Sequence, residues 1–243
     1  MGLGVLHMKK SLFVAALIAA ASFTHSAHAE LLKLTQTSQV PEFKYNLDVV
    51  GIKPGMTMDV AKEILIKEFE GIRIEESGAR YEYKNVESEP FITGLYGYTK
   101  SDGNVILRLT SPVLGSVVSS IERSIDYSDV QNKPSPVDLM VMLSEKYGEP
   151  FQYSKSRSQF KLSWHYGDDC KKVAKPDGWS YTTKKCPISL NARIDISSGD
   201  ELKRLVVNLD DNTISRLDIN SIPTFITEYL DKLPKEPVVA PKL

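Results

Sequence analysis

The stretch that decides the fold is residues 51–69, which read GIKPGMTMDVAKEILIKEF. Its first six residues are rich in glycine and proline and predict a turn. Thr57 then stands where the N-cap of a helix is expected. From Met58 to Phe69, apolar residues recur at spacings of three and four, which predicts a helix with one buried face. The residues expected to point inward are Val60, Ala61, Ile64, Leu65 and Phe69.

A β-rich region is expected after this helix. Tyr81 and Tyr83 alternate with charged residues, which is the period-two pattern of a strand. Tyr96 and Tyr98 have the same spacing within residues 93–99. Further strands are expected at residues 105–109 and 116–126, with a hairpin turn at residues 101–104.

The order of a helix followed by strands occurs a second time. A proline-containing linker at residues 132–136 precedes a helix expected over residues 137–147, and Gly148 and Pro150 end it. Its expected inward residues are Leu139, Met140, Leu143 and Tyr147. Strands are then expected at residues 160–166, 190–196 and 205–209, followed by a turn at 210–212, a short helix at 223–233 and a disordered tail at 234–243.

These patterns place the chain in the α+β class. Residues 30–48 show little helical periodicity and are interpreted as an N-terminal arm. We expect two helix-plus-antiparallel-sheet modules in tandem, the first in residues 30–131 and the second in residues 137–233. Trp164 is expected to be buried in the second of them.

Residues 8–29 have the order of a secretory signal peptide. Met8, Lys9 and Lys10 form a positively charged start, residues 12–21 are apolar, and residues 27–29 match a cleavage site. Residues 1–7 are interpreted as an upstream extension. The apolar run is shorter than the roughly 20 residues that a spanning helix needs, and no later stretch is apolar enough, so no membrane span is expected. We expect removal of residues 1–29 and a mature chain that is periplasmic or secreted.

The composition argues against several classes of function. The 30 Lys and Arg residues nearly balance the 31 Asp and Glu residues, and no basic stripe appears. Nucleic acid is therefore not expected as a partner. Three of the four His residues lie within residues 1–29, which leaves His165. Several His ligands cannot meet in one mature chain, and neither a metal nor a cofactor is expected.

Cys170 and Cys186 both lie in the expected mature chain. In an oxidising compartment, a pair at this spacing favours a structural disulfide that staples the loop between the two cysteines. The alternative is a redox-active or metal-binding thiol pair. The spacing is not that of a C-x-x-C motif, and the sequence contains no third Cys.

Two motifs carry a resemblance to known modules. The first is the turn at residues 51–57 with Ala61 and Leu65 behind it, and the second is the helix end at residues 143–150. The first resembles the opening signature of outer-membrane-assembly lipoproteins of the SmpA/OmlA type, and the layout is similar to the β-lactamase-inhibitor-protein fold. The lipoproteins carry a lipid-modified Cys, and the residue directly after the expected cleavage site here is Glu30. The resemblance implies a fold of binding modules, and no functional residue is carried over from it.

Aromatic residues supply the candidate binding sites. Trp179 and Tyr181 lie near the centre of the lysine-rich loop between the two cysteines, where they would form a contact element or belong to a solvated hairpin. A second set presents two tyrosines on each of two expected strands, and forms either a binding patch or core packing under the first helix. This second set comprises Tyr81, Tyr83, Tyr96 and Tyr98.

His165 is the remaining candidate for catalysis. The alternation of its strand places it on the opposite face from Trp164 and Tyr166. Because no nucleophile motif of the G-x-S-x-G kind occurs, a surface or packing role is favoured. We expect a non-enzymatic protein-binding module that acts on another protein of the envelope or outside the cell, as an inhibitor, an immunity protein or an envelope-assembly accessory. The alternative is a secreted hydrolase or toxin that uses His165. A third hypothesis, carriage of a small ligand between helix and sheet, has no distinctive residues to support it.

Overall fold

The structure is a computed structural model that describes residues 31–100, 103–168, 170, 172–174, 180–182 and 186–233. The expected signal peptide, Trp179 and the expected tail lie outside the described residues. No helix within the described ranges is long and apolar enough to cross a bilayer.

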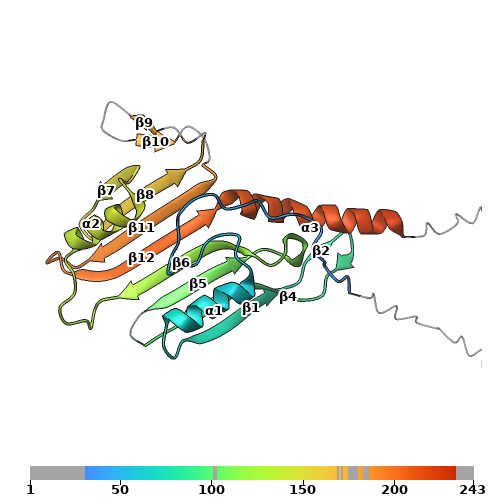
Figure 1. The fold of residues 1–243 in the computed structure, drawn as a ribbon, viewed down its shortest axis with the longest axis horizontal. Coiled ribbons are helices and arrows are strands. Elements are labelled where there is room, and N and C mark those ends of the chain that lie inside the picture. The colour runs from blue at the N-terminus through green and yellow to red at the C-terminus, as the bar shows by residue number, and fades with distance from the viewer. Residues whose placement is uncertain are drawn as a thin grey trace, which may run out of the picture. The chain divides into compact units, whose positions relative to one another are not determined.

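Eight strands form one antiparallel sheet, in the order β1-β4-β5-β6-β12-β11-β8-β7 (Figure 1). Together with the helices, this sheet confirms the expected α+β class. The strands are β1 (Arg73–Ala79), β4 (Phe91–Tyr98), β5 (Asn104–Leu109), β6 (Val118–Asp126), β7 (Gln152–Lys155), β8 (Gln159–Tyr166), β11 (Ile188–Ile196) and β12 (Leu202–Asp211). Two short hairpins stand apart from this sheet, namely β2 (Glu82–Tyr83) with β3 (Val86–Glu87) and β9 (Lys172–Ala174) with β10 (Ser180–Thr182).

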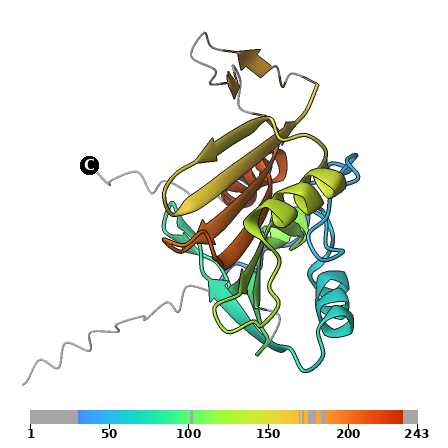
Figure 2. The same cartoon turned by 90° about the vertical axis from the view of Figure 1, so that its left-hand side faces the viewer.

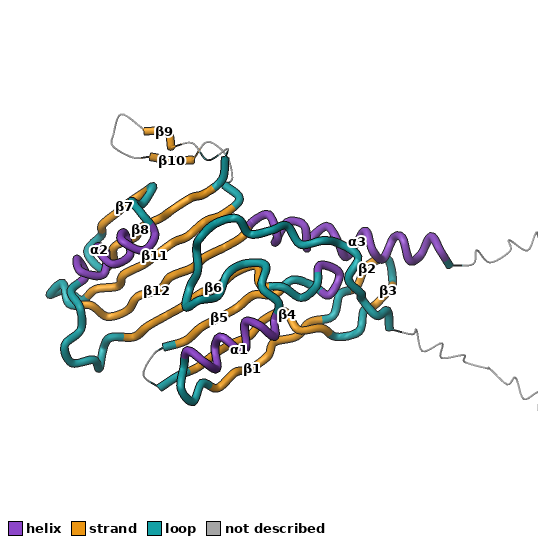
Figure 3. The backbone as a smooth tube through the Cα atoms, viewed as in Figure 1, coloured by secondary structure: helices purple, strands orange, loops and turns teal. Residues whose placement is uncertain are grey.

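The order of one helix and four sheet strands occurs twice along the chain. Helix α1 (Met58–Glu68) precedes β1, β4, β5 and β6, and helix α2 (Pro136–Tyr147) precedes β7, β8, β11 and β12. The two sets of strands meet where β6 pairs with β12, so they share one continuous sheet (Figure 3). Residues 31–233 belong to one compact unit. The division into two tandem modules stays a prediction.

One face of the sheet forms the main core. A row of side chains crosses neighbouring strands in register and is completely or almost completely buried. It consists of Leu95, Leu107, Ile121, Leu209, Leu190 and Trp164. Helices α1 and α2 lie on this face, as Figure 2 shows. Trp164 is 2% exposed, which confirms the expectation that it is buried.

Helix α1 follows the predicted pattern with one exception. Ala61, Leu65 and Phe69 are buried in the main core, but Val60 is 44% exposed, so the expectation that Val60 points inward is wrong. These three buried residues are spaced four apart and form one stripe, and Val60 lies beside that stripe rather than on it. Thr57 is the N-cap residue as expected, although its side chain makes no capping hydrogen bond.

The last helix is much longer than predicted. The sequence predicts a turn at residues 210–212 and a short helix from residue 223, but α3 runs over Asn212–Lys232 with Pro223 inside it. Asp211 starts this helix because its carboxylate accepts hydrogen bonds from the backbone N–H groups of Thr213 and Ile214. Proline is usually excluded from helix interiors, so a helix that continues through Pro223 runs against its local preference.

The first strand was also missed. Strand β1 at the edge of the sheet is largely exposed and polar, so it lacks the apolar alternation that marks a half-buried strand. The expected strand at Tyr81 and Tyr83 is instead the two-residue hairpin of β2 and β3. Edge strands are commonly charged in this way, which discourages pairing with other chains.

Candidate functional site

The second face of the sheet carries no helix in the part of the chain that the structure describes. We call this surface the open face. The buried residues of α3 belong to two smaller clusters, separate from the main core of the sheet. Figure 2 shows α1 and α2 together on the other side of the strands. The open face is therefore a broad surface that the described residues leave without a covering helix.

Strand register places one continuous row of side chains across all eight strands on the open face. The row is Glu75, Tyr96, Ile106, Glu122, Asn208, Asn191, Ser163 and Gln152. The adjacent row contains Arg73, Tyr98, Asn104, Ser124, Val206, Arg193, Lys161 and Ser154. Tyr96, Tyr98 and Ile106 are neighbours in these rows and form the apolar part of the face, which we call the tyrosine patch.

Polar side chains around the tyrosine patch form hydrogen bonds and an ion pair with one another. The Ser120 hydroxyl donates to Asp210 Oδ1 at 2.7 Å, and Asn208 Nδ2 donates to Asp210 Oδ2 at 2.8 Å. Further out, the Arg193 guanidinium lies 3.2 Å from the Asp195 carboxylate. These contacts restrict the rotamers of the side chains before any partner arrives, and pre-ordering lowers the entropy cost of binding.

The four candidate tyrosines do not form one patch. Tyr96 and Tyr98 lie on the open face, and Tyr98 is 40% exposed. Tyr81 and Tyr83 pack instead against the cluster formed by the N-terminal arm and α3, around Ile222. The expectation of one aromatic surface from neighbouring strands is wrong because β2 leaves the sheet, whereas β4 stays within it.

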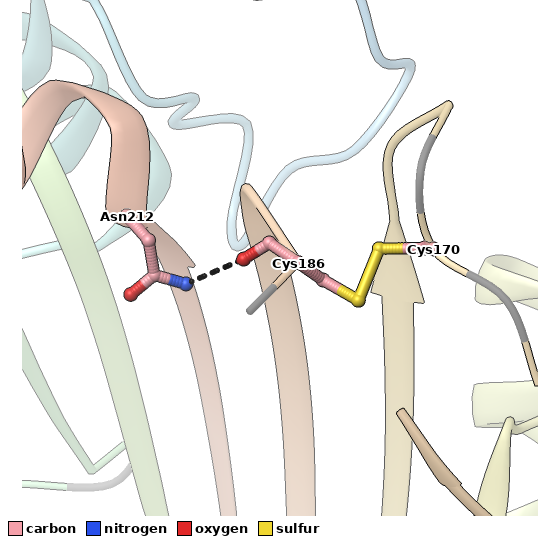
Figure 4. The surroundings of a disulfide bond; sticks show 3 residues. All are labelled: Cys170, Cys186 and Asn212. Atoms are coloured by element: carbon pink, nitrogen blue, oxygen red, sulfur yellow. Dashed lines mark hydrogen bonds between the residues drawn. A yellow bond between two sulfur atoms is a disulfide. The ribbon is translucent and has the colours of Figure 1, made fainter. Parts of the chain in front are cut away.

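The structure confirms the disulfide that closes the stapled loop. Cys170 and Cys186 form a disulfide with their Cα atoms 5.4 Å apart (Figure 4). The loop joins β8, which ends at Tyr166, to β11, which begins at Ile188, as expected. Its hairpin of β9 and β10 stands at the end of these strands rather than along the sheet edge. Tyr181 lies in β10 opposite Val173, and Trp179 lies outside the described residues.

His165 lies on the open face opposite Ser189, on the other side of the strand from Trp164, as the alternation predicts. Its ring packs edge-to-face on Phe151, with the ring centroids 5.4 Å apart. In the described ranges its imidazole makes no hydrogen bond to a carboxylate or a hydroxyl. A hydrolase would need both a nucleophile and an orienting carboxylate there. Nor do the described residues contain a group of His, Cys, Asp and Glu that could hold a metal ion.

Burial lowers the pKa of His165 from its usual value of 6.5. The unfolded chain therefore takes up this proton at a higher pH than the folded chain does. We expect the contribution of His165 to the free energy of unfolding to be fully present above pH 6.5. It should decrease as the pH drops from 6.5 toward the pKa of His165 in the folded protein. His165→Asn should remove this part of the pH dependence. Urea midpoints measured between about pH 7.5 and about pH 5 check this, and parallel curves for both proteins would contradict it.

A cavity lies on the helix side of the sheet, at residues that the sequence pattern does not single out. Its volume is 230 Å³, and it is lined by residues of β6, β12, α2 and the arm before α1. Arg123 is the charged residue that β6 contributes to it, between Ile121 and Ile125 on the same face of the strand. A positive charge at an inward position of a predicted strand is the sequence signal that would have identified this site.

Comparison of the chain with protein-family models, with curated proteins and with solved structures finds no match.

Proposed function

We propose that this protein is a non-enzymatic binding module that docks a protein partner on its open face, in the periplasm or outside the cell. The observation that carries the proposal is the eight-stranded sheet whose helices α1 and α2 lie on one face only. Exposed apolar groups ringed by polar side chains are typical of interaction surfaces. The roles of inhibitor, immunity protein and envelope-assembly accessory are all compatible with such a module.

The open face has the size that a stable protein interface needs. Eight strands at a spacing of about 4.8 Å give a width of about 34 Å. The longer strands carry four open-face residues each, which gives a length of about 20 Å because alternate residues are about 6.8 Å apart, whereas β7 carries two. The product is therefore at most about 700 Å², which approaches the roughly 800 Å² that each partner contributes to a standard interface.

The tyrosine patch is the expected centre of binding energy. Tyr98 and Tyr96 offer large contact areas with few rotatable bonds, and Ile106 lies beside Tyr96 in the register. The charged pair of Arg73 and Glu75 flanks them on β1. An aromatic centre with a polar rim excludes water from the contacts that matter most. The location rests on the signal-peptide pattern and is compatible with the disulfide of Cys170 and Cys186.

Tyr98→Ala should weaken partner binding by about 30-fold, which corresponds to the roughly 2 kcal/mol of an interface hot spot. The matched control is Tyr153→Ala, since Tyr153 is 50% exposed but lies on the helix side of β7. The parent protein and both variants, without residues 1–29, are immobilised under oxidising conditions. Partners are recovered from envelope extracts and identified. The dissociation constant of the purified partner is then measured for each protein. Equal losses for both variants, or no specific partner for the parent protein, would refute the proposal.

A further inference from the structure

The cavity on the helix side lies where the two halves of the sheet join. Arg123 on β6 is in register with Val207 on β12, and both line the cavity. Leu139 and Leu143 of α2 form one part of its wall, and Val49, which directly follows the N-terminal arm, forms another. The lining is mainly apolar, and polar groups are concentrated on Arg123, Lys146 and two tyrosines. This site is on the opposite side of the sheet from the open face, so it is independent of the proposed function.

Two of the polar groups already have partners. Lys146 Nζ lies 3.1 Å from Asp48 Oδ1. The hydroxyl of Tyr147 donates to the backbone carbonyl oxygen of Asp48 at 2.9 Å. The charges of Lys146 and Asp48 therefore compensate each other at one end of the cavity.

Arg123 has no such partner. Its guanidinium lies over the ring of Phe69, with 5.3 Å between Cζ and the ring centroid. Its Nε is buried and has no hydrogen-bond acceptor, and no carboxylate of the described chain forms an ion pair with it. A buried donor without an acceptor is costly, and more so when it carries a charge. Among the described residues, the positive charge of Arg123 therefore has no carboxylate partner in the cavity.

Tyr127 supplies a second unused donor near Arg123. Burial raises the pKa of Tyr127, and the nearby Arg123 charge opposes this increase. The Tyr127 hydroxyl makes no hydrogen bond to any described residue, although the backbone N–H of Tyr127 donates to the backbone carbonyl oxygen of Lys203. The phenol thus stays neutral at physiological pH and can donate to an anion that Arg123 binds.

We propose that this cavity binds a small amphipathic carboxylic acid, whose carboxylate accepts hydrogen bonds from Arg123 and Tyr127 and whose alkyl chain lies against Leu139, Leu143 and Val207. A guanidinium matches a carboxylate in charge and geometry. The volume of 230 Å³ is below the roughly 300–1,000 Å³ of pockets for drug-sized ligands, which favours a single short chain over a two-chain lipid.

Decanoate is the test ligand, titrated into the mature, disulfide-bonded protein by calorimetry. We expect saturable binding that Arg123→Met weakens at least tenfold, because the charge-assisted hydrogen bonds are lost. Arg193→Met is the matched control, since Arg193 lies on the open face, and it should bind decanoate like the parent protein. Decanol has the same chain without the charge and should bind at least tenfold more weakly than decanoate.

A second variant keeps the test decisive if Arg123→Met does not fold. Tyr127→Phe removes one hydroxyl and should weaken decanoate binding about threefold to tenfold without affecting decanol. The proposal is overturned if decanoate does not bind saturably, if decanol binds as tightly as decanoate, or if folded Arg123→Met and Tyr127→Phe both bind like the parent protein. None of these outcomes bears on docking at the open face.

Discussion

Replacing Trp164 with Ala should lower the free energy of unfolding by about 3–5 kcal/mol. The indole is 2% exposed and packs edge-to-face on Tyr147, with 5.8 Å between the ring centroids. Its Nε1 donates to the carbonyl oxygen of Gly148 at 2.7 Å. Trp164 therefore joins β8 to the end of α2, and truncation leaves both a cavity and a carbonyl group without its partner.

Two further variants separate these contributions. Trp164→Phe keeps an aromatic ring but leaves the Gly148 carbonyl unpaired, so we expect a loss of about 1–3 kcal/mol. Lys161→Ala changes an exposed residue of the same strand on the open face and should stay within about 0.5 kcal/mol of the parent protein. Urea unfolding followed by far-ultraviolet circular dichroism measures all three. A loss below about 1 kcal/mol for Trp164→Ala would contradict the packing described.

The sequence predicts most of the sheet because burial on one side leaves a period-two pattern. In β8, Phe160, Leu162 and Trp164 are buried, and Lys161 and His165 point to the open face. The same reasoning succeeds for α2, where Leu139, Leu143 and Tyr147 are buried at helical spacing. A capping box between Ser135 and Asp138 begins this helix.

The remaining elements depend on contacts that are distant in sequence. Helix α3 continues through Pro223 while Ile222 and Ile226 pack against the N-terminal arm and Val113. Tertiary packing of this kind overrides a local propensity. The joining of both halves into one sheet depends on β6 pairing with β12, and no local pattern specifies which strand edges meet.

In the candidate site, too, the sequence predicts the local features but not those that depend on contacts distant in sequence. The alternation of Tyr96 and Tyr98 predicts that they share a face, and they do. It does not predict that Tyr81 and Tyr83 leave the sheet with the β2–β3 hairpin. The sequence does not single out Arg123, because a charged residue inside a strand is usually solvent-exposed, although its alternation with Ile121 and Ile125 is the signal that places it on the core face.

Removing the disulfide should have the second large effect on stability. Cys170 and Cys186 are 16 residues apart in sequence, and closing a loop of this size contributes about 3 kcal/mol in the chain-entropy model. The double variant Cys170→Ala, Cys186→Ala should therefore unfold at a lower urea concentration by a corresponding amount. Thiol labelling of the unreduced, denatured parent protein should find no free Cys.

The position of the disulfide indicates which part of the structure its removal would destabilise. Cys186 is 6% exposed, and its carbonyl oxygen accepts a hydrogen bond from Asn212 Nδ2 at 3.2 Å (Figure 4). Because Asn212 is the first residue of α3, this hydrogen bond holds the disulfide-bonded end of the loop against the start of that helix. Asn212→Ala removes only the hydrogen bond and should cost about 1 kcal/mol, which makes it the matched control. Denaturant unfolding reports the stability of the whole cooperative unit. If the double variant unfolds at the same urea concentration as the parent protein, the prediction is wrong, and the disulfide constrains the loop without stabilising the sheet.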